Sequence, residues 1–598
     1  MVTGHVDPEC VEFFRKGAPF LGVLPRSGIG DPCEPLAGKS LSVLRRECQQ
    51  SNAALVGSLR EAEKSQELFD CTEADAKLGR MSPPVPFDAE AMKSVRLSPR
   101  FAVEKVKADG STAIRPVDHF SWGSLEAQGL SQASFFCLSV CGCAWSVPDC
   151  FQAKRRRLEK EQSSNGCCVP QEKMHHDHVD KLVAMLRKAM QGTGKQQGLF
   201  KADIDSAFRR VPIDVEHTWA YGVAFLHDGI VWTSVHTSSP FGAVASVHAW
   251  ERIGALVAHI ARKCLKLVLA RYVDDYFGCE SLETLEHALS CFARLVRLLL
   301  GESALAEKKL DFGSNLEVLG IEMQVSWENY FCRPSAIKKR KWLLMIRKAL
   351  ASGVLRGGEA SKLAGKLQWA CQHMFNRVGR AMLRALYNQI HNPSGRTSPE
   401  LVVALRWWEA ILELDMVECR SLHLPNKAPV HLFCDAAGAP ARVAAVLWVD
   451  GRVLYTDCAP PEAVVRHWKV REDQQIMGLE LLSIALGLSS FEQLLMGRCV
   501  VIHSDNTGAE CCFRKGAAKE FDHCSLIHNM WTQIARCHMN VWVCRVGTDD
   551  NIADLPSRFE YSALLFAGAQ FVEPGFHESY ESADAWAEFV RKCGRVAT

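Results

Sequence analysis

Two adjacent aspartates directly follow an apolar stretch in LKLVLARYVDDYFG, residues 265–278. The apolar run predicts a strand, so Asp274 and Asp275 are expected at the tip of a hairpin. Adjacent aspartates often serve only as turn formers. Neighbouring carboxylates nevertheless repel each other unless a cation neutralises them, and carboxylate oxygens are the ligands that Mg²⁺ prefers. The pair therefore favours a fold that brings further acids to this turn around a metal ion.

A second acidic turn lies far upstream, in LFKADIDSAFRRVPI at residues 199–213. This stretch reads as a strand that ends at Asp203. Transfer of a phosphoryl group to a hydroxyl is helped by two divalent ions roughly 3.5–4 Å apart. Asp203 can join Asp274 and Asp275 at such a site only if their two strands lie side by side. Between them, TSSPFGAVASVHAWERIG (237–254) predicts a loop with Pro and Gly that leads into a helix.

Four acids in the C-terminal part repeat this pattern. Each stands at the end of a predicted strand or in a predicted helix: Asp435 in HLFCDAAGA, Glu480 in QQIMGLELLSIALGL, Asp505 in CVVIHSDNTGA and Asp554 in NIADLPSR. Singly, each would more often be a helix cap or a solvated charge. Together they predict a second site built on the same two-metal chemistry.

The bulk composition is that of an ordinary globular protein. The 598 residues are 23% charged with a formal net charge of +2, so any basic surface that holds a polyanion must be local. The 25 cysteines follow no repeating spacing. We expect no secretory leader and no membrane span, and reduced thiols in the cytoplasm or nucleus.

The pattern of strands and helices divides the chain into five parts. The prediction is an unassigned region at 1–95, an α/β unit at 96–325, a helical unit at 326–428, a mixed-sheet unit at 429–558 and a weakly amphipathic tail at 559–598. Within the second part, residues 124–165 look like an insertion. Its cysteines (Cys137, Cys141, Cys143 and Cys150) favour an inserted loop with free thiols over a zinc cluster, because they lack a paired CxxC. The histidines His175, His176 and His178 likewise favour a solvated helix start over a metal site.

The order D-x-x-x-A-F, then PFG, then YVDD resembles the reverse transcriptase family. The resemblance implies a right-hand polymerase with an α+β palm, fingers, and a helical thumb and connection. It implies that Lys107 and Arg115 contact the phosphates of the incoming nucleotide, and that Phe208 excludes a ribose 2′-hydroxyl. Phe241 and Gly242 would pack against that nucleotide, with Lys308 or Lys309 near its triphosphate. LEVLGIEM (316–323) is similar to a primer grip.

The C-terminal acids resemble the D-E-D-D site of ribonuclease H, with Arg545 where related domains carry a mobile histidine. The helices before them are similar to those of retrotransposons of the tyrosine-recombinase (DIRS-like) type. The resemblance therefore implies RNA- and DNA-directed DNA synthesis with hydrolysis of RNA in the hybrid. Each site would bind two Mg²⁺, or Mn²⁺ in their place.

The expected partners are an RNA template, a DNA primer and product, the RNA–DNA hybrid and deoxynucleoside triphosphates, together with a recombinase or integrase and no membrane. The alternative is a decayed or domesticated copy of the same fold that binds nucleic acid without catalysis. Such a copy should have lost carboxylates, and all seven are present. A telomerase- or maturase-type polymerase is disfavoured by the trailing ribonuclease H-like part.

Overall fold

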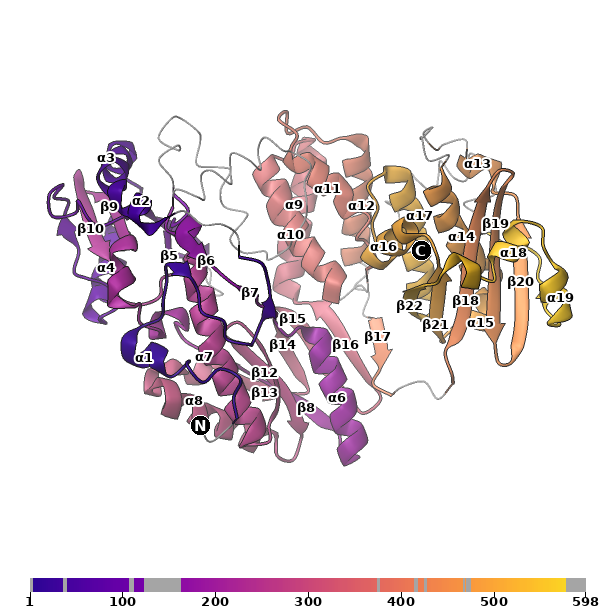
Figure 1. The fold of residues 1–598 in the computed structure, drawn as a ribbon, viewed down its shortest axis with the longest axis horizontal. Coiled ribbons are helices and arrows are strands. Elements are labelled where there is room, and N and C mark those ends of the chain that lie inside the picture. The colour runs from indigo at the N-terminus through magenta and orange to yellow at the C-terminus, as the bar shows by residue number, and fades with distance from the viewer. Residues whose placement is uncertain are drawn as a thin grey trace. The chain divides into compact units, whose positions relative to one another are not determined.

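The structure is a computed structural model that describes residues 4–35, 40–106, 112–122, 163–373, 377–413, 418–423, 427–465, 468 and 475–576. The chain forms two compact units, Met1–Leu319 with Val325–Trp327, and Gly320–Gln324 with Glu328–Thr598. Both are built from helices and mixed sheets, which confirms the predicted α/β class (Figure 1). Among the helices of the described residues, none combines the length and the apolar character needed to cross a bilayer.

The central sheet of the first unit carries the first group of aspartates. Its antiparallel strands follow the order β11 (Val268–Tyr272), β12 (Asp275–Ser281), β8 (Gln197–Asp203) and β13 (Leu310–Gly313). Helices α6 (Val179–Thr193), α7 (Val244–Lys263) and α8 (Leu285–Leu300) pack against these strands. Because side chains alternate along a strand, Phe200 and Ala202 of β8 enter the core while Asp203 belongs to the opposite face.

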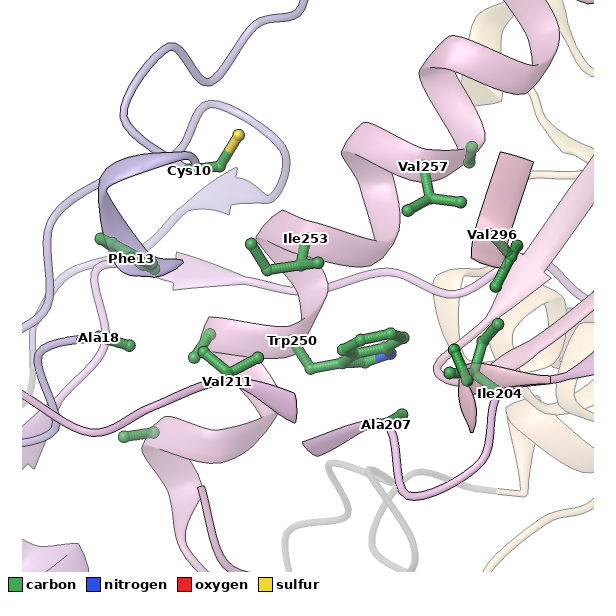
Figure 2. Close-up of a cluster of buried hydrophobic side chains, with 14 of the residues drawn as sticks. Cys10, Phe13, Ala18, Ile204, Ala207, Val211, Trp250, Ile253, Val257 and Val296 are labelled. Carbon is green, nitrogen blue, oxygen red and sulfur yellow. The ribbon is translucent and has the colours of Figure 1, made fainter. Parts of the chain in front are cut away.

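The core of this unit lies between α7, α8 and β8. Apolar residues recur along α7 at helical spacing, as Trp250, Ile253 and Val257. Figure 2 shows the ring of Trp250 pointing toward Ile204, while Ile253 lies on the side of Cys10 and Phe13 of the N-terminal segment. The N-terminal region, which had no predicted role, thus contributes buried residues to this core. Its elements are α1 (Glu12–Lys16), β1 (Gly22–Val23), β2 (Asp31–Pro32), α2 (Leu41–Arg46), α3 (Cys48–Ser58) and α4 (Ser65–Lys77).

A second sheet of this unit has the order β3 (Val85–Pro86), β10 (Ile230–Val235), β9 (Gly222–His227), β4 (Leu97–Val106) and β5 (Thr112–Asp118). Strands β4 and β9 are parallel and the other pairs are antiparallel. The short strands β6 (Cys168–Val169) and β7 (Glu172–Lys173) pair with β1 and β2. Strand β5 places Arg115 three residues before its buried end at Asp118.

The second unit begins with β15 (Ile321–Val325), except its last residue Val325, and β16 (Asn329–Pro334). Strand β17 (Glu418–Ser421) pairs with β16. Within the described residues, β16 is followed by helices α9 (Ala336–Ser352), α10 (Gly357–His373), α11 (Leu383–Ile390) and α12 (Pro399–Glu413). They pack as a bundle, α12 against α9 and α11, and α10 against α11 (Figure 1). Leu363, Leu367 and Ala370 recur at helical spacing along α10 and are fully buried.

A six-stranded sheet completes the second unit, in the order β22 (Asn540–Arg545), β21 (Cys499–Ser504), β18 (Val430–Gly438), β19 (Ala441–Val449), β20 (Arg452–Cys458) and β23 (Gln570–Phe571). Strands β18, β21 and β22 are parallel, and β18, β19 and β20 are antiparallel. Helix α14 (Ile476–Ser490) is buried around most of its circumference and packs on β18 and β19. The remaining helices are α13 (Glu462–Val465), α15 (Glu492–Leu495), α16 (Thr507–Lys515), α17 (Phe521–Arg536), α18 (Asp554–Ser557) and α19 (Ser562–Phe566).

Candidate active sites

The first carboxylate site lies where β8 ends and β12 begins. Asp203, the last residue of β8, is the direct cross-strand partner of Asp275, the first residue of β12. Tyr272 and Asp275 close the β11–β12 hairpin, so Val273 and Asp274 form its two-residue turn. The backbone amide of Ile204 donates to the carbonyl of Asp274 over 3.1 Å. The structure therefore brings the three predicted aspartates to the same end of one sheet.

The carboxylates at this end repel one another, as expected without a cation. Burial, followed by the charges of Asp274 and Asp203, raises the pKa of Asp275 to about 6. Burial also raises the pKa of Asp274, with a further contribution from Asp203. The site is thus destabilised in its fully ionised form and would gain from a bound cation.

One lysine already compensates part of this charge. The Nζ atom of Lys309 lies 3.0 Å from Oδ2 of Asp203 and 3.2 Å from Oδ1 of Asp205. Burial lowers the pKa of Lys309, but the hydrogen bonds and charges of Asp203 and Asp205 outweigh this effect and the pKa is raised. Its neighbour Lys308 is exposed. Of the two lysines predicted near a triphosphate, the structure places Lys309 beside the aspartates.

Four of the residues predicted to lie at the incoming nucleotide are close to one another. The guanidinium of Arg115 stacks over the ring of Phe241, 4.6 Å from its centroid. The ring of Phe208, at the start of a 3₁₀ turn (Phe208–Arg210), lies 5.5 Å from that of Phe241. Gly242 has a φ of 92°, and a Cβ there would lie 2.4 Å from the carbonyl oxygen of Asp118, so only glycine fits. Lys107 lies outside the described residues.

Asn165, which had no predicted role, holds the Phe241–Gly242 segment in place. Its Nδ2 donates to the carbonyl of Gly242 over 2.9 Å, and its Oδ1 accepts from the amide of Val244 over 2.9 Å. Asn165 is the last residue of the predicted insertion 124–165, of which only residues 163–165 are described. These three residues are buried, so the end of that segment is part of the packed unit.

A buried ionic network lies at the end of β5, the strand that carries Arg115. The carboxylate of Asp118 accepts hydrogen bonds from Arg100 over 3.0 Å and pairs with Nε2 of His236 over 3.0 Å. Burial alone would raise the pKa of Asp118, but the charges of Arg100 and His236 lower it to about 2. This network ties the strand that carries Arg115 to the segment leading to Phe241.

The second carboxylate site is formed by Asp435, Glu480 and Asp505. Asp435 lies within β18, Asp505 follows the parallel neighbour β21, and Glu480 is in the first turns of α14. One oxygen from each carboxylate lies within 4.8 Å of the others. Three acids from distant parts of the sequence therefore share one small volume.

The charges at this site are poorly compensated. Burial, then the charges of Asp435, Asp505 and Asp554, raises the pKa of Glu480 to about 9. Burial also raises the pKa of Asp435, which a 2.6 Å hydrogen bond from Oγ of Ser557 partly offsets. Oε2 of Glu480 is buried and has no hydrogen-bond partner within the described part of the chain.

These observations fit a bound divalent cation. An unpaired buried carboxylate oxygen beside two further carboxylates supplies the hard, anionic donors that Mg²⁺ or Mn²⁺ requires. The aspartates of the first site also offer such donors, but they do not form a group with all ligand oxygens within 4.8 Å. There, the carboxylate of Asp203 is paired with Lys309. A cation at the first site would therefore require this pair to loosen.

Asp554, the fourth predicted acid, lies at the edge of the second site. It contributes to the raised pKa of Glu480, but its own carboxylate accepts from Nε of Arg558 over 2.8 Å. Asn551, which had no predicted role, donates to the carbonyl of Cys434 over 3.1 Å and fixes the preceding loop to β18. Arg545 ends β22 and is exposed. Asp549 and Asp550, in the 3₁₀ turn Thr548–Asp550, are exposed as well.

Other histidines and acids of the kinds that bind metals form hydrogen bonds or ion pairs within the protein instead. His175 pairs with Asp31 over 2.6 Å and His176 with Glu251 over 3.3 Å, and neither belongs to a metal-ligand group among the described residues. Glu61, His227 and Asp228 do form such a group, but Glu61 already accepts from the backbone amides of Asp228 and Gly229. The cysteines of the predicted insertion lie outside the described residues.

The sequence matches no family model and no curated protein. Among solved structures, the chain is similar to the foamy viral protease-reverse transcriptase in complex with dsDNA, with 13% identity, a TM-score of 0.40, and coverage of 90% of this chain and 92% of that one. The same viral protein in complex with an RNA/DNA hybrid gives 13% identity and a TM-score of 0.37 over 87% of this chain and 64% of that one. The likeness is distant.

Proposed function

We propose that the chain is an RNA- and DNA-directed DNA polymerase in which Asp203, Asp274 and Asp275 hold the catalytic metal ions. The strand register carries this proposal, because it makes Asp203 and Asp275 direct partners and places Asp274 in the adjoining turn. Acids this close, with raised pKa values at Asp274 and Asp275, are costly unless they bind cations. Two Mg²⁺ ions would activate the primer hydroxyl and stabilise the leaving group.

The side chains around these aspartates fit a nucleotide site. Arg115 is exposed and supplies a cation for the phosphates, and its stacking on Phe241 fixes the direction of its guanidinium. Phe208 packs beside Phe241, so its ring has little freedom to move away from a ribose 2′-hydroxyl. Lys309 holds Asp203 until a metal ion competes for that carboxylate. These residues would bind, orient and select a deoxynucleoside triphosphate.

We further propose that Asp435, Glu480, Asp505 and Asp554 hydrolyse the RNA strand of an RNA–DNA hybrid. The support is the three-carboxylate group with its unpaired buried oxygen. The resemblance of the sequence favours a retrotransposon of the DIRS-like type as the element that encodes the chain. A recombinase or integrase would then be supplied as a separate protein. The chain itself would act in the cytoplasm or nucleus.

Primer extension and hybrid cleavage by the full chain test both activities. Asp274→Asn is expected to abolish extension of a DNA primer on an RNA template while hybrid cleavage continues, and Asp505→Asn to do the reverse. Asp549→Asn removes the same charge from an exposed loop and should change neither activity. A parent chain that binds hybrid duplex but neither extends nor cleaves would refute the proposal and favour the non-catalytic alternative.

A further inference from the structure

The turn that carries Asp274 has a backbone conformation that its sequence disfavours. Val273 has a φ of 54°, which is an outlier for a β-branched residue. In a two-residue hairpin turn, a positive φ at this first position favours glycine. Because valine stands there, contacts from outside the turn must hold it in this conformation.

Two buried side-chain donors bond to the carbonyl oxygen of Val273. Nε1 of Trp250 lies 2.8 Å from it and Nη1 of Arg271 lies 2.7 Å from it. A carbonyl oxygen has two lone pairs and can accept both bonds. Trp250 is 0% exposed and Arg271 is 8% exposed, so water cannot readily replace either donor. Figure 2 shows the ring of Trp250 pointing from α7 toward Ile204, the residue that follows Asp203.

Arg271 is itself fixed by α7. Its other terminal nitrogen forms an ion pair with Glu251, which is 1% exposed and adjacent to Trp250 in sequence. One turn further along α7, a Cβ at position 254 would lie 2.7 Å from Nη1 of Arg271, so Gly254 leaves room for the guanidinium. We call Trp250, Glu251, Gly254 and Arg271 the α7 cradle. The cradle leaves the carbonyl of Val273 little freedom to move.

We propose that Trp250 and Arg271 are positioning residues that hold the strained Val273 turn, so that Asp274 and Asp275 are arranged for metal binding before the metal ions arrive. This inference rests on the proposed polymerase function. Loss of one donor should allow the turn to relax toward a negative φ at Val273 and move the two carboxylates apart. More Mg²⁺ would then be needed for the same rate. Binding of the primer–template should not change, because Trp250 is buried.

Trp250→Phe removes the N–H donor and keeps an aromatic ring in the core. From the usual contribution of one such hydrogen bond, we expect the Mg²⁺ concentration for half-maximal extension to rise about 2- to 10-fold. The KM for primer–template should stay unchanged. Val257→Ala, a core truncation two turns further along α7, is the control. It should lower the Tm without shifting the Mg²⁺ midpoint.

The second variant separates positioning from general damage. Glycine adopts a positive φ without strain, so adding Val273→Gly to Trp250→Phe should restore the Mg²⁺ midpoint of the parent. Adding Val273→Ala instead removes the same branched side chain but still disfavours a positive φ, and should not restore the midpoint. An unchanged midpoint in Trp250→Phe, no recovery with glycine, or equal recovery with alanine would each overturn the inference.

Metal binding can be measured without polymerase activity. Mn²⁺ titrations followed by electron paramagnetic resonance, on the full chain with Glu480→Gln and Asp505→Asn to silence the second site, report on the first site alone. If the parent fails to extend primers, the proposed function fails. The shift with Trp250→Phe and its recovery with Val273→Gly in these titrations would still support the inference, and their absence would refute it.

Discussion

Glu480→Gln is expected to stabilise the metal-free protein, although it removes a residue of the second carboxylate site. Burial and three neighbouring acids raise the pKa of Glu480 to about 9, from 4.5 in the unfolded chain. Because the pKa of Glu480 is raised in the folded state, ionisation of Glu480 destabilises the fold. The free energy of unfolding is therefore highest below pH 4.5 and falls as the pH rises toward 9. Each pH unit above 4.5 costs about 1.4 kcal/mol, so the loss at pH 7 is about 3 kcal/mol.

Glutamine keeps nearly the same shape and does not ionise, so the variant avoids this loss. Thermal unfolding in a chelator should show Glu480→Gln to be more stable than the parent at pH 7, by a margin that vanishes near pH 4 and grows toward pH 9. Saturating Mg²⁺ should reduce or reverse the difference, because only the parent gains a full set of carboxylate ligands. Glu573→Gln, at an exposed position of the same unit, is the control. A margin that stays constant with pH, or a less stable glutamine variant at pH 7, would refute the reasoning.

Three further changes test the surroundings of the two sites. Phe208→Ala should admit ribonucleotides with little loss of deoxynucleotide use, which competition between the two sugars measures. Asn165→Ala frees the carbonyl of Gly242, and we expect the KM for deoxynucleotides to rise about 5- to 10-fold while the KM for primer–template stays unchanged. Ser557→Ala removes the donor to Asp435 and should raise the Mg²⁺ needed for hybrid cleavage by about tenfold, with primer extension as the internal control.

The secondary structure around the acids was predictable, because the end of a strand leaves a simple signal in the sequence. An apolar run followed by Asp203 or Asp505 predicted strands that end there, and β8 and β21 confirm both. The apolar stretch around Glu480 predicted a helix, which α14 confirms. The α/β class followed from the same alternation. Local hydrophobic patterning was sufficient for these features, since each depends on neighbours in the sequence.

Contacts between distant segments were not predictable in this way. Asn165 reaches Gly242, and Ser557 reaches Asp435, only because the fold brings together residues far apart in the chain. Neither residue differs in its local sequence from an ordinary turn or helix polar group. The choice between Lys308 and Lys309 depends on the direction of a single 3₁₀ turn (Glu307–Lys309), which hydrophobic periodicity does not determine.

The two carboxylate sites differ in how each compensates its charge without metal. At the first site, Lys309 pairs with Asp203, and the most perturbed acid, Asp275, has a pKa of about 6 and is largely ionised at pH 7. At the second site, protonation of Glu480, whose pKa is about 9, takes the place of a cation. A metal ion must therefore displace a proton at the second site but compete with a lysine at the first.

Between pH 7 and pH 9 the Mg²⁺ concentration for half-maximal hybrid cleavage should fall by up to about tenfold per pH unit, while the Mg²⁺ concentration for half-maximal extension should change little. Equal pH dependence of the two midpoints would show that Glu480 does not govern metal binding at the second site.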